Sequence, residues 1–242
     1  MTFISEEKMN NKPFVSAVIV SAGNSSRMGG VNKQFLNICG IPVIAHSIKA
    51  FQDCAFINEI VIVTRDVDID NIKRVTKDYN FTKVVAVVCG GETRQLSVLN
   101  GIKEINTSAD FVAIHDGARP LVTEKVILDT LSCAIEFNAA TTGVKVVDTI
   151  KSVDENEDIV DTPNRAFLRA VQTPQIFNKE LYLNAVNNVP NSKDFTDDCK
   201  LIEAFGHKVK IVDGDYENIK ITTPSDIEIA TYYLSKRREN NA

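Results

Sequence analysis

Short runs of apolar, mostly β-branched residues alternate along this chain with longer segments whose apolar residues recur every three or four positions. The first pattern favours strands, and the second favours helices that bury one face. The predicted strands span residues 15–21, 59–64, 84–88, 111–114 and 142–147. Strands that alternate with helices are typical of a mostly parallel sheet covered by helices on both faces. The pattern therefore predicts the α/β class.

Three local sequences predict where helices begin. Pro42 precedes a segment whose apolar residues share one side of a helix. Thr123 is followed by Glu124, an arrangement that caps a helix N-terminus. In the run 223–226, Thr can cap, Pro fits the first turn and Asp faces the positive end of the helix dipole. We expect helices to start at these three points.

The pattern changes between residues 148 and 170. Acidic residues there surround two short strand-like pieces, at 149–153 and 159–160. Because an isolated hairpin is only marginally stable in water, we expect a protruding β-arm that packs on a second copy of the chain. A mobile acidic surface loop is the alternative.

The composition excludes several classes of protein. The 242 residues carry 27 Lys plus Arg against 32 Asp plus Glu, a net charge of -5, so the broad basic surface of a nucleic-acid binder is absent. The longest unbroken apolar run, Val84–Cys89, is far shorter than the roughly 20 residues that a membrane helix needs. We expect neither nucleic acid nor a membrane as a partner.

The N-terminus and the cysteines predict a cytoplasmic protein. Glu6, Glu7 and Lys8 precede the first apolar run, which does not fit a secretory signal. We expect residues 1–12 to form a flexible tail and residues 13–242 to form a single domain. The five cysteines are widely spaced and include no Cys-x-x-Cys pair, which predicts free thiols in a reducing compartment.

The loop after the first predicted strand is a candidate phosphate site, because ligands of open α/β sheets bind beyond the carboxyl ends of the strands. Residues 21–30 are mostly small and include Arg27, and Lys33 follows. Small residues such as Ala22 and Gly23 let backbone N–H groups approach phosphates, and the two cations add positive charge. We interpret the segment as a triphosphate cradle, with a plain surface loop as the alternative. Its spacing fits neither the dinucleotide fingerprint nor the P-loop.

Two further loops carry candidate ligand groups. Gly90 and Gly91 follow the third predicted strand and can allow backbone contact with a flat base, whose edge Ser97 can hydrogen-bond. A simple glycine turn is the alternative. Asp116 follows the fourth strand, and a carboxylate that faces a triphosphate is suited to hold Mg²⁺. We interpret its neighbour His115 as a structural hydrogen-bonding residue.

Asp68 and Asp70 imitate a metal-binding Asp-x-Asp pair. They open a polar helix, where acidic side chains interact favourably with the positive end of the dipole. We therefore interpret both as charges on the dipole and on the solvent face.

Several sequence blocks follow one another in a recognisable order from about residue 15 to 235. They are Ala22-Gly23 with Arg27-Met28, Lys33, Gly90-Gly91-Glu92-x-Arg94 with Ser97-Val98, His115-Asp116-Gly117-Ala118-Arg119-Pro120, Asp148-Thr149-Ile150-Lys151, Gln172-Thr173-Pro174-Gln175-x-Phe177, Thr196-Asp197-Asp198 and Asn218-Ile219-Lys220-x-Thr222. In these blocks the chain resembles the 2-C-methyl-D-erythritol 4-phosphate cytidylyltransferases. Ser21 and Ser25 depart from the family's cradle, which usually has Ala and Gly there.

The resemblance implies a Rossmann-like open, mostly parallel twisted sheet of the nucleotidyltransferase type, with the arm. It implies transfer of CMP from CTP to the sugar-alcohol phosphate, with release of pyrophosphate, in the non-mevalonate isoprenoid pathway. The implied catalytic residues are Arg27, Lys33, Arg165 and Lys220. The implied CTP-binding residues are Ala22, Gly23, Gly90, Gly91, Ser97, Asp116 and Gly117, with Asp116 also holding Mg²⁺. The implied sugar-phosphate-binding residues are Thr149, Arg165, Thr173 and Lys220.

The resemblance also implies a homodimer, in which the arm carries Thr149 and Arg165 into the partner's substrate site. Three alternatives compete with this function. Ribitol 5-phosphate cytidylyltransferases share several blocks but typically differ at the His-Asp and Thr-Asp-Asp blocks. A nucleotide-binding regulator would not need the cations, and a nicotinamide-dependent oxidoreductase would need the glycine fingerprint that is missing here.

Overall fold

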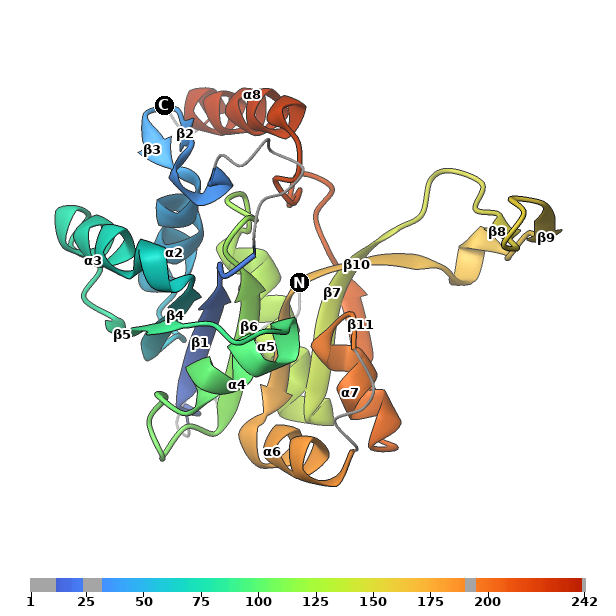
Figure 1. Cartoon of the computed structure of the whole chain (residues 1–242), viewed down its shortest axis with the longest axis horizontal. Helices are drawn as coiled ribbons and strands as arrows, with labels where there is room; N and C mark the ends of the chain where they lie inside the picture. The colour runs from blue at the N-terminus through green and yellow to red at the C-terminus, as the bar shows by residue number, and fades with distance from the viewer. Residues whose placement is uncertain (1–11, 24–31, 190–194, 241–242) are drawn as a thin grey trace.

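The computed structural model describes residues 12–23, 32–189 and 195–240. A seven-stranded sheet forms the centre of the molecule (Figure 1), in the order β11-β7-β10-β6-β1-β4-β5. Its strands are β1 Val15–Val20, β4 Glu59–Thr64, β5 Val84–Cys89, β6 Phe111–Asp116, β7 Ala139–Lys145, β10 Arg169–Asn178 and β11 Lys210–Asp213. Neighbouring strands are parallel except at β10, which is antiparallel to both β6 and β7. The predicted mostly parallel α/β sheet is confirmed.

The five predicted strands match β1, β4, β5, β6 and β7, although β7 begins three residues earlier than predicted, at Ala139. The sequence analysis missed β10 and β11. A proline inside a run argues against a strand, and Pro174 lies within β10 at an irregularity in its pairing with β7. β11 is only four residues long, which is too short to show a clear period.

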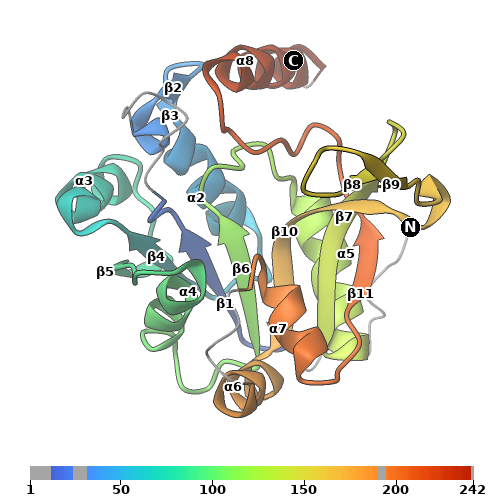
Figure 2. The same cartoon turned by 45° about the vertical axis from the view of Figure 1, so that its right-hand side comes forward.

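Helices cover both faces of the sheet, as Figure 2 shows. Along β1, Val15, Ala17 and Ile19 belong to one buried cluster and Val18 to another, because successive strand residues point to opposite faces. The first cluster is covered by α2 Val43–Asp53, α3 Ile69–Asp78 and α5 Glu124–Phe137. The second is covered by α4 Arg94–Ile102, α6 Lys179–Asn188 and α7 Asp198–Ala204.

A smaller buried cluster joins α8 Pro224–Asn240 to Ile38 of β2 Asn37–Ile38, which pairs with β3 Ile41–Pro42. Ile221, on the segment before α8, is fully buried in this cluster. The cluster therefore fixes the segment that carries Lys220.

The three predicted helix starts are confirmed. Pro42 directly precedes α2. Thr123 Oγ1 accepts the N–H of Val126 at 3.4 Å at the start of α5. At the start of α8, Asp226 accepts the backbone N–H groups of residues 222 and 223.

The segment between β7 and β10 contains the antiparallel pair β8 Ser152–Val153 and β9 Ile159–Asp161, which is separate from the central sheet. Figure 1 draws this pair at the far right, connected to the ends of β7 and β10. Ile159 and Val160 are exposed, and Phe167 in the turn η4 Arg165–Phe167 is 85% exposed. The two short strands predicted here are present, and packing against a second copy stays a prediction.

The interpretation of Asp68 was wrong. Its side chain is buried, and its Oδ2 accepts hydrogen bonds from Arg65 Nε at 2.6 Å and from Asn32 Nδ2 at 2.9 Å. These partners draw the carboxylate inward, whereas Asp70 is exposed as expected. The 3-10 turn η3 Asp66–Asp68 leads into α3 at this point.

Two further features concern the helices and the cysteines. None of the described helices has both the length and the apolar composition needed to cross a membrane. All five cysteines are free thiols.

Candidate active site

A cavity of about 440 Å³ opens at the carboxyl ends of β1, β5 and β6. Ligands of parallel α/β sheets collect at this edge. The predicted ligand residues that line it are Ala22, Gly23, Gly91, Ser97, Asp116 and Lys220. Residues from distant parts of the sequence are therefore brought together in one pocket.

The glycines of the cavity loops are required by close packing. A Cβ atom on Gly90 would lie 2.5 Å from the Cβ of Ala22, and one on Gly91 would lie 2.4 Å from the Cβ of Leu96. A Cβ atom on Gly117 would lie 2.7 Å from the Cδ1 of Ile44. These distances are too short for any side chain, so substitution at the three positions would displace the walls.

Ser97 shapes the loop between β5 and α4. Its Oγ accepts the N–H of Gly91 at 3.0 Å and donates to the carbonyl oxygen of Thr93 at 2.9 Å. The hydroxyl thus fixes the Gly91 backbone at the edge of the cavity. Its contact with a base stays a prediction.

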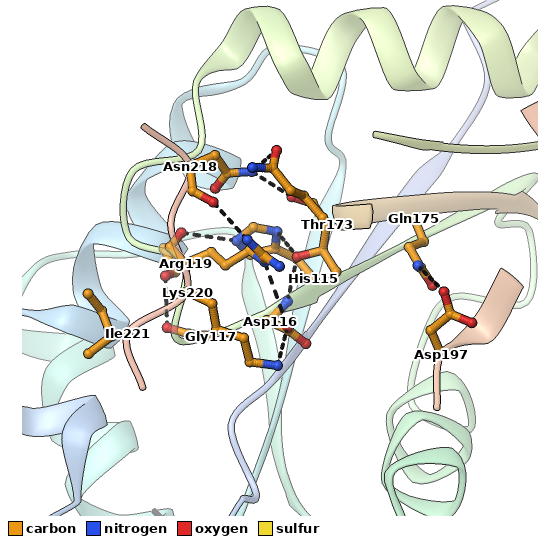
Figure 3. Close-up of polar contacts among 12 residues, drawn as sticks. His115, Asp116, Gly117, Arg119, Thr173, Gln175, Asp197, Asn218, Lys220 and Ile221 are labelled. Atoms are coloured by element: carbon orange, nitrogen blue, oxygen red, sulfur yellow. Dashed lines mark hydrogen bonds and ion pairs between the residues drawn. The ribbon is translucent and has the colours of Figure 1, made fainter. Parts of the chain in front are cut away.

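Asp116 is a half-buried anion in the cavity wall (Figure 3). Its Oδ2 lies 2.7 Å from Lys220 Nζ and 3.8 Å from Arg119 Nε. Burial raises the pKa of this carboxyl, but the positive charges of Lys220, Arg94 and Arg119 outweigh burial and lower the pKa to about 2. Asp116 is therefore ionised at neutral pH and holds the Lys220 ammonium at the cavity.

Thr173 lies behind Asp116 and is buried, and it connects this residue to His115. The Thr173 Oγ1 accepts the N–H of Asp116 at 3.1 Å and lies 3.0 Å from His115 Nδ1, while His115 Nε2 lies 3.2 Å from the carbonyl oxygen of Arg119. Since that carbonyl only accepts, Nε2 carries the proton and Nδ1 accepts from Thr173. Burial lowers the pKa of His115 to about 4, so its imidazole is neutral at pH 7.

The structural interpretation of His115 is thereby confirmed. The Thr173 hydroxyl lies between the backbone N–H of Asp116 and the His115 ring. The role of Thr173 in binding the sugar phosphate stays a prediction.

Lys33 begins the 3-10 turn η2 Lys33–Phe35, and its Nζ donates to the carbonyl oxygen of Ile221 at 2.7 Å. Because Ile221 directly follows Lys220, the Lys33 ammonium contacts the segment that carries Lys220.

Sequence reasoning missed Gln34, which is buried and lines the cavity. Its Oε1 has no hydrogen-bond partner among the described residues. Its place next to Lys33 was its only signal in the sequence.

Arg94 adds a second cation to the cavity lining. Its NH1 forms a hydrogen-bonded ion pair with Oδ2 of the buried Asp198, whose Oδ1 accepts from the Tyr182 hydroxyl at 2.7 Å. Burial lowers the pKa of Arg94, but the charges of Asp198 and Asp116, together with the hydrogen bond to Asp198, outweigh burial and raise the pKa. Arg94 and Asp198 lie in the sequence blocks that carry the family resemblance. No local pattern in the sequence indicated that these two residues form an ion pair.

Two predicted catalytic or acceptor-binding residues, Thr149 and Arg165, lie away from the cavity, and a third cannot be placed. Arg27 lies outside the described residues. Thr149 and Arg165 are exposed in the segment around β8 and β9, where Arg165 NH1 donates to the carbonyl oxygen of Val147 at 2.7 Å. Within one chain, Thr149 and Arg165 do not join Asp116 and Lys220 in the cavity.

A mostly parallel α/β sheet has a cavity at its carboxyl ends with glycine-containing loops, a lysine, an arginine and a carboxylate in its lining. This combination is typical of a nucleotide-binding or phosphate-binding α/β protein. The family model described as 2-C-methyl-D-erythritol 4-phosphate cytidylyltransferase matches residues 15–236. The chain belongs to this family.

Individual relatives agree with the family match. The chain is 47% identical over 225 residues to the 2-C-methyl-D-erythritol 4-phosphate cytidylyltransferase of Caldanaerobacter subterraneus subsp. tengcongensis, covering 92% of this chain and 99% of the relative. It is 43% identical over 234 residues to the protein of the same name from Alkaliphilus oremlandii, covering 96% and 99%. These names favour the methylerythritol phosphate family over the ribitol phosphate alternative.

Solved structures show the same fold. The 4-diphosphocytidyl-2C-methyl-D-erythritol synthase of Anaerococcus prevotii superposes with a TM-score of 0.83 at 34% identity, covering 94% of this chain and 98% of that one. The 2-C-methyl-D-erythritol 4-phosphate cytidylyltransferase of Thermus thermophilus gives a TM-score of 0.75 at 28% identity, covering 92% and 99%. The predicted Rossmann-like fold of the nucleotidyltransferase type is confirmed.

Proposed function

We propose that this chain transfers the CMP group of CTP to 2-C-methyl-D-erythritol 4-phosphate and releases pyrophosphate, a step of non-mevalonate isoprenoid synthesis. The observation that carries the proposal is the cavity in which Lys220 and Arg94 stand beside the glycine-walled loops. A triphosphate and a phosphate acceptor are both anions, so their reaction requires cations that are already in position.

The reaction is an in-line displacement at phosphorus. A phosphate oxygen of the acceptor attacks the α-phosphorus of CTP, the bond from this phosphorus to the bridging oxygen breaks, and pyrophosphate leaves. Lys33 and Arg27 stabilise the negative charge that develops around the α-phosphate, and Lys220 holds the acceptor phosphate. No covalent nucleophile is needed.

The nucleotide lies along the glycine-walled loops. Backbone N–H groups at Ala22 and Gly23 bind the triphosphate. The loop that contains Gly91, fixed by Ser97, contacts the cytosine. Cytosine is the smaller type of base, and we expect this base site to discriminate against a purine.

Mg²⁺ belongs to this proposal, with Asp116 as its protein ligand. The site fits the ion, because Asp116 is an ionised carboxylate at the cavity wall and Mg²⁺ commonly takes one or two carboxylates plus substrate phosphate oxygens. No group of three or more His, Cys, Asp or Glu within residues 12–23, 32–189 and 195–240 could hold a metal. The ion would offset triphosphate charge. Lys220 pairs with Asp116 at 2.7 Å and would exchange that partner for the acceptor phosphate.

A homodimer of the domain at residues 13–242 is the proposed catalytic unit. The exposed apolar side chains of the arm at 148–170, among them Ile159, Val160 and Phe167, would pack on the second copy. Thr149 and Arg165 would then enter the partner's acceptor site, which is consistent with their absence from the cavity lining of their own chain. The free thiols support our proposal that the enzyme works in the cytoplasm.

The test is pyrophosphate release with CTP and Mg²⁺, with 2-C-methyl-D-erythritol 4-phosphate and ribitol 5-phosphate offered in parallel. UTP and ATP serve as nucleotide controls. We expect turnover with CTP and the methylerythritol phosphate alone. Preference for ribitol phosphate would overturn the assigned acceptor, and silence with both acceptors would overturn the activity.

A further inference from the structure

Asp68 is a buried carboxylate outside the cavity. Its Oδ2 accepts from Arg65 Nε at 2.6 Å, within its own turn, and from Asn32 Nδ2 at 2.9 Å, on a segment 36 residues earlier in the chain. A carboxylate paired with an arginine can only accept hydrogen bonds. Asn32 must therefore present its amide nitrogen to Asp68, which fixes the orientation of the whole amide.

The fixed amide of Asn32 caps the turn that carries Lys33. With its nitrogen bound to Asp68, Asn32 points Oδ1 at the backbone N–H of Gln34, which donates to it at 3.1 Å. The N–H of Phe35 donates to the carbonyl oxygen of Asn32 at 3.1 Å. These two bonds close the first turn of η2, of which Lys33 is the first residue.

Lys33 then reaches the cavity edge. Its Nζ donates to the carbonyl oxygen of Ile221 at 2.7 Å, next to Lys220, which pairs with Asp116 at 2.7 Å. Three successive contacts thus run from Asp68 through Asn32 and Lys33 to the segment that bears Lys220.

We infer that Asp68 is a positioning residue for the reaction: through the Asn32 amide, it sets the turn from which Lys33 acts. The inference rests on the proposed function, because it assigns Lys33 to the transferred phosphate. Asp68 itself touches no substrate in this scheme. Its effect is expected in turnover, since a charge displaced by about 1 Å can cost on the order of 100-fold in rate.

An exchange of amide and carboxylate tests the contact. Asn32→Asp keeps a good N-cap residue but removes the donor and places two carboxylates together. Adding Asp68→Asn to the same chain removes the repulsion between the two carboxylates and restores a donor opposite position 32. Because Arg65 Nε and Asn32 Nδ2 share Oδ2 of Asp68 in the unaltered chain, Arg65 must turn to the side-chain oxygen of the new amide. Asp70→Asn is the matched control, because Asp70 lies two positions further on and is exposed.

We expect Asn32→Asp to lower kcat by about 10- to 100-fold with KM for CTP changed by less than about twofold. We expect the double variant to recover most of this loss, and Asp70→Asn to match the unaltered chain. An unaltered kcat in Asn32→Asp would overturn the inference, and so would a double variant no better than Asn32→Asp. Thermal unfolding of each variant identifies any loss that comes from misfolding.

A second experiment tests whether Asn32 and Asp68 change kcat through Lys33. In a Lys33→Ala background, Asn32→Asp should add no further loss of kcat, because the group being positioned is gone. A full additional loss in that background would assign Asn32 and Asp68 to general stability instead, and would overturn the inference.

Amide hydrogen exchange separates failure of this inference from failure of the proposed function. The Gln34 N–H should exchange faster in Asn32→Asp and recover its protection in the double variant. If the unaltered chain releases no pyrophosphate with any acceptor, the proposed function fails, and the exchange data still test the contact. Equal exchange in all variants would overturn the inference by itself.

Discussion

The cavity wall and the β8–β9 hairpin differ in how their side chains are held. In the wall, partners come from distant segments. Arg119 NH1 donates to the carbonyl oxygen of Asn218 at 2.7 Å, and Asn218 Nδ2 donates to the carbonyl oxygen of Thr173 at 3.0 Å. These bonds connect the loop after β6 and the middle of β10 to the segment before α8.

In the hairpin, polar contacts are local. Asp154 Oδ1 accepts the N–H groups of Asn156 at 2.9 Å and Asp158 at 3.0 Å, all within one turn. The apolar side chains of Val153, Ile159 and Val160 are exposed.

The difference separates two requirements of the proposed reaction. Charges at the cavity must be fixed before the substrates arrive, because reorganising them during the reaction would cost rate. The hairpin needs only a stable turn and an apolar surface, since its proposed partner is a second copy of the chain. Each prediction below changes one side of this comparison.

The largest effect is expected for Lys33→Ala. The variant should fold normally and lose turnover by roughly 100-fold or more, as expected for removal of one transition-state donor. Steady-state pyrophosphate release measures kcat, and circular dichroism with thermal unfolding checks the fold. Near-normal turnover would remove Lys33 from the mechanism.

The next largest effect is expected in the pH dependence of folding stability, through His115. Its folded pKa of about 4 lies below the ordinary value of 6.5, so the unfolded chain takes up a proton first as the pH falls. Stability from the neutral imidazole is therefore complete above pH 6.5 and is lost as the pH falls towards 4. Between about pH 7.5 and about pH 5 the loss should be about 2 kcal/mol.

Urea unfolding at several pH values measures this loss. Because other groups also titrate, the comparison is with His115→Gln, whose stability should depend less on pH in the same window. Parallel curves for the two proteins would show that His115 does not carry the effect.

Mixing two inactive variants tests the hairpin side. Lys33→Ala chains keep an intact arm, and Arg165→Ala chains keep an intact cavity. If each arm serves the partner's site, random mixing makes half of the dimers mixed, and each mixed dimer has one complete site. About a quarter of normal activity should return after the chains are unfolded and refolded together. No recovery would place Arg165 in its own chain's site or outside the reaction.

The sequence could predict those features that depend on neighbouring residues. Short runs of apolar, mostly β-branched residues located five strands of the sheet, and Thr123 and Asp226 marked helix starts, because such runs and helix caps are local features. The loops after strands were found because a parallel sheet brings their carboxyl ends together.

Features set by distant contacts could not be predicted. The sequence indicated that Asp68 faces solvent, because its partner Asn32 lies 36 residues away in the chain. The contact of Gly90 with a base stays a prediction, but its close approach to Ala22, which leaves no room for a Cβ, had no signal in the sequence. Both outcomes depend on which segments lie side by side in space, and no local pattern reports that.

The smallest change in the free energy of unfolding is expected for two carboxylates that accept hydrogen bonds from the backbone of a turn. Asp226 Oδ2 accepts the N–H groups of Thr222 at 2.7 Å and Thr223 at 2.8 Å, directly after the segment with Lys220. Asp226→Ala should cost about 1 kcal/mol, as for the loss of a helix cap, and should raise KM for the acceptor because Lys220 is displaced.

Asp154→Ala is the matched change in the hairpin. It removes two similar bonds, but from an exposed turn whose N–H groups water can satisfy, so it should cost less than about 0.5 kcal/mol and leave KM unchanged. Urea unfolding and acceptor titrations of both variants measure the difference. Equal costs would mean that the hairpin turn is held as firmly as the cavity wall, and the contrast between the two regions would then lie only in their apolar surfaces.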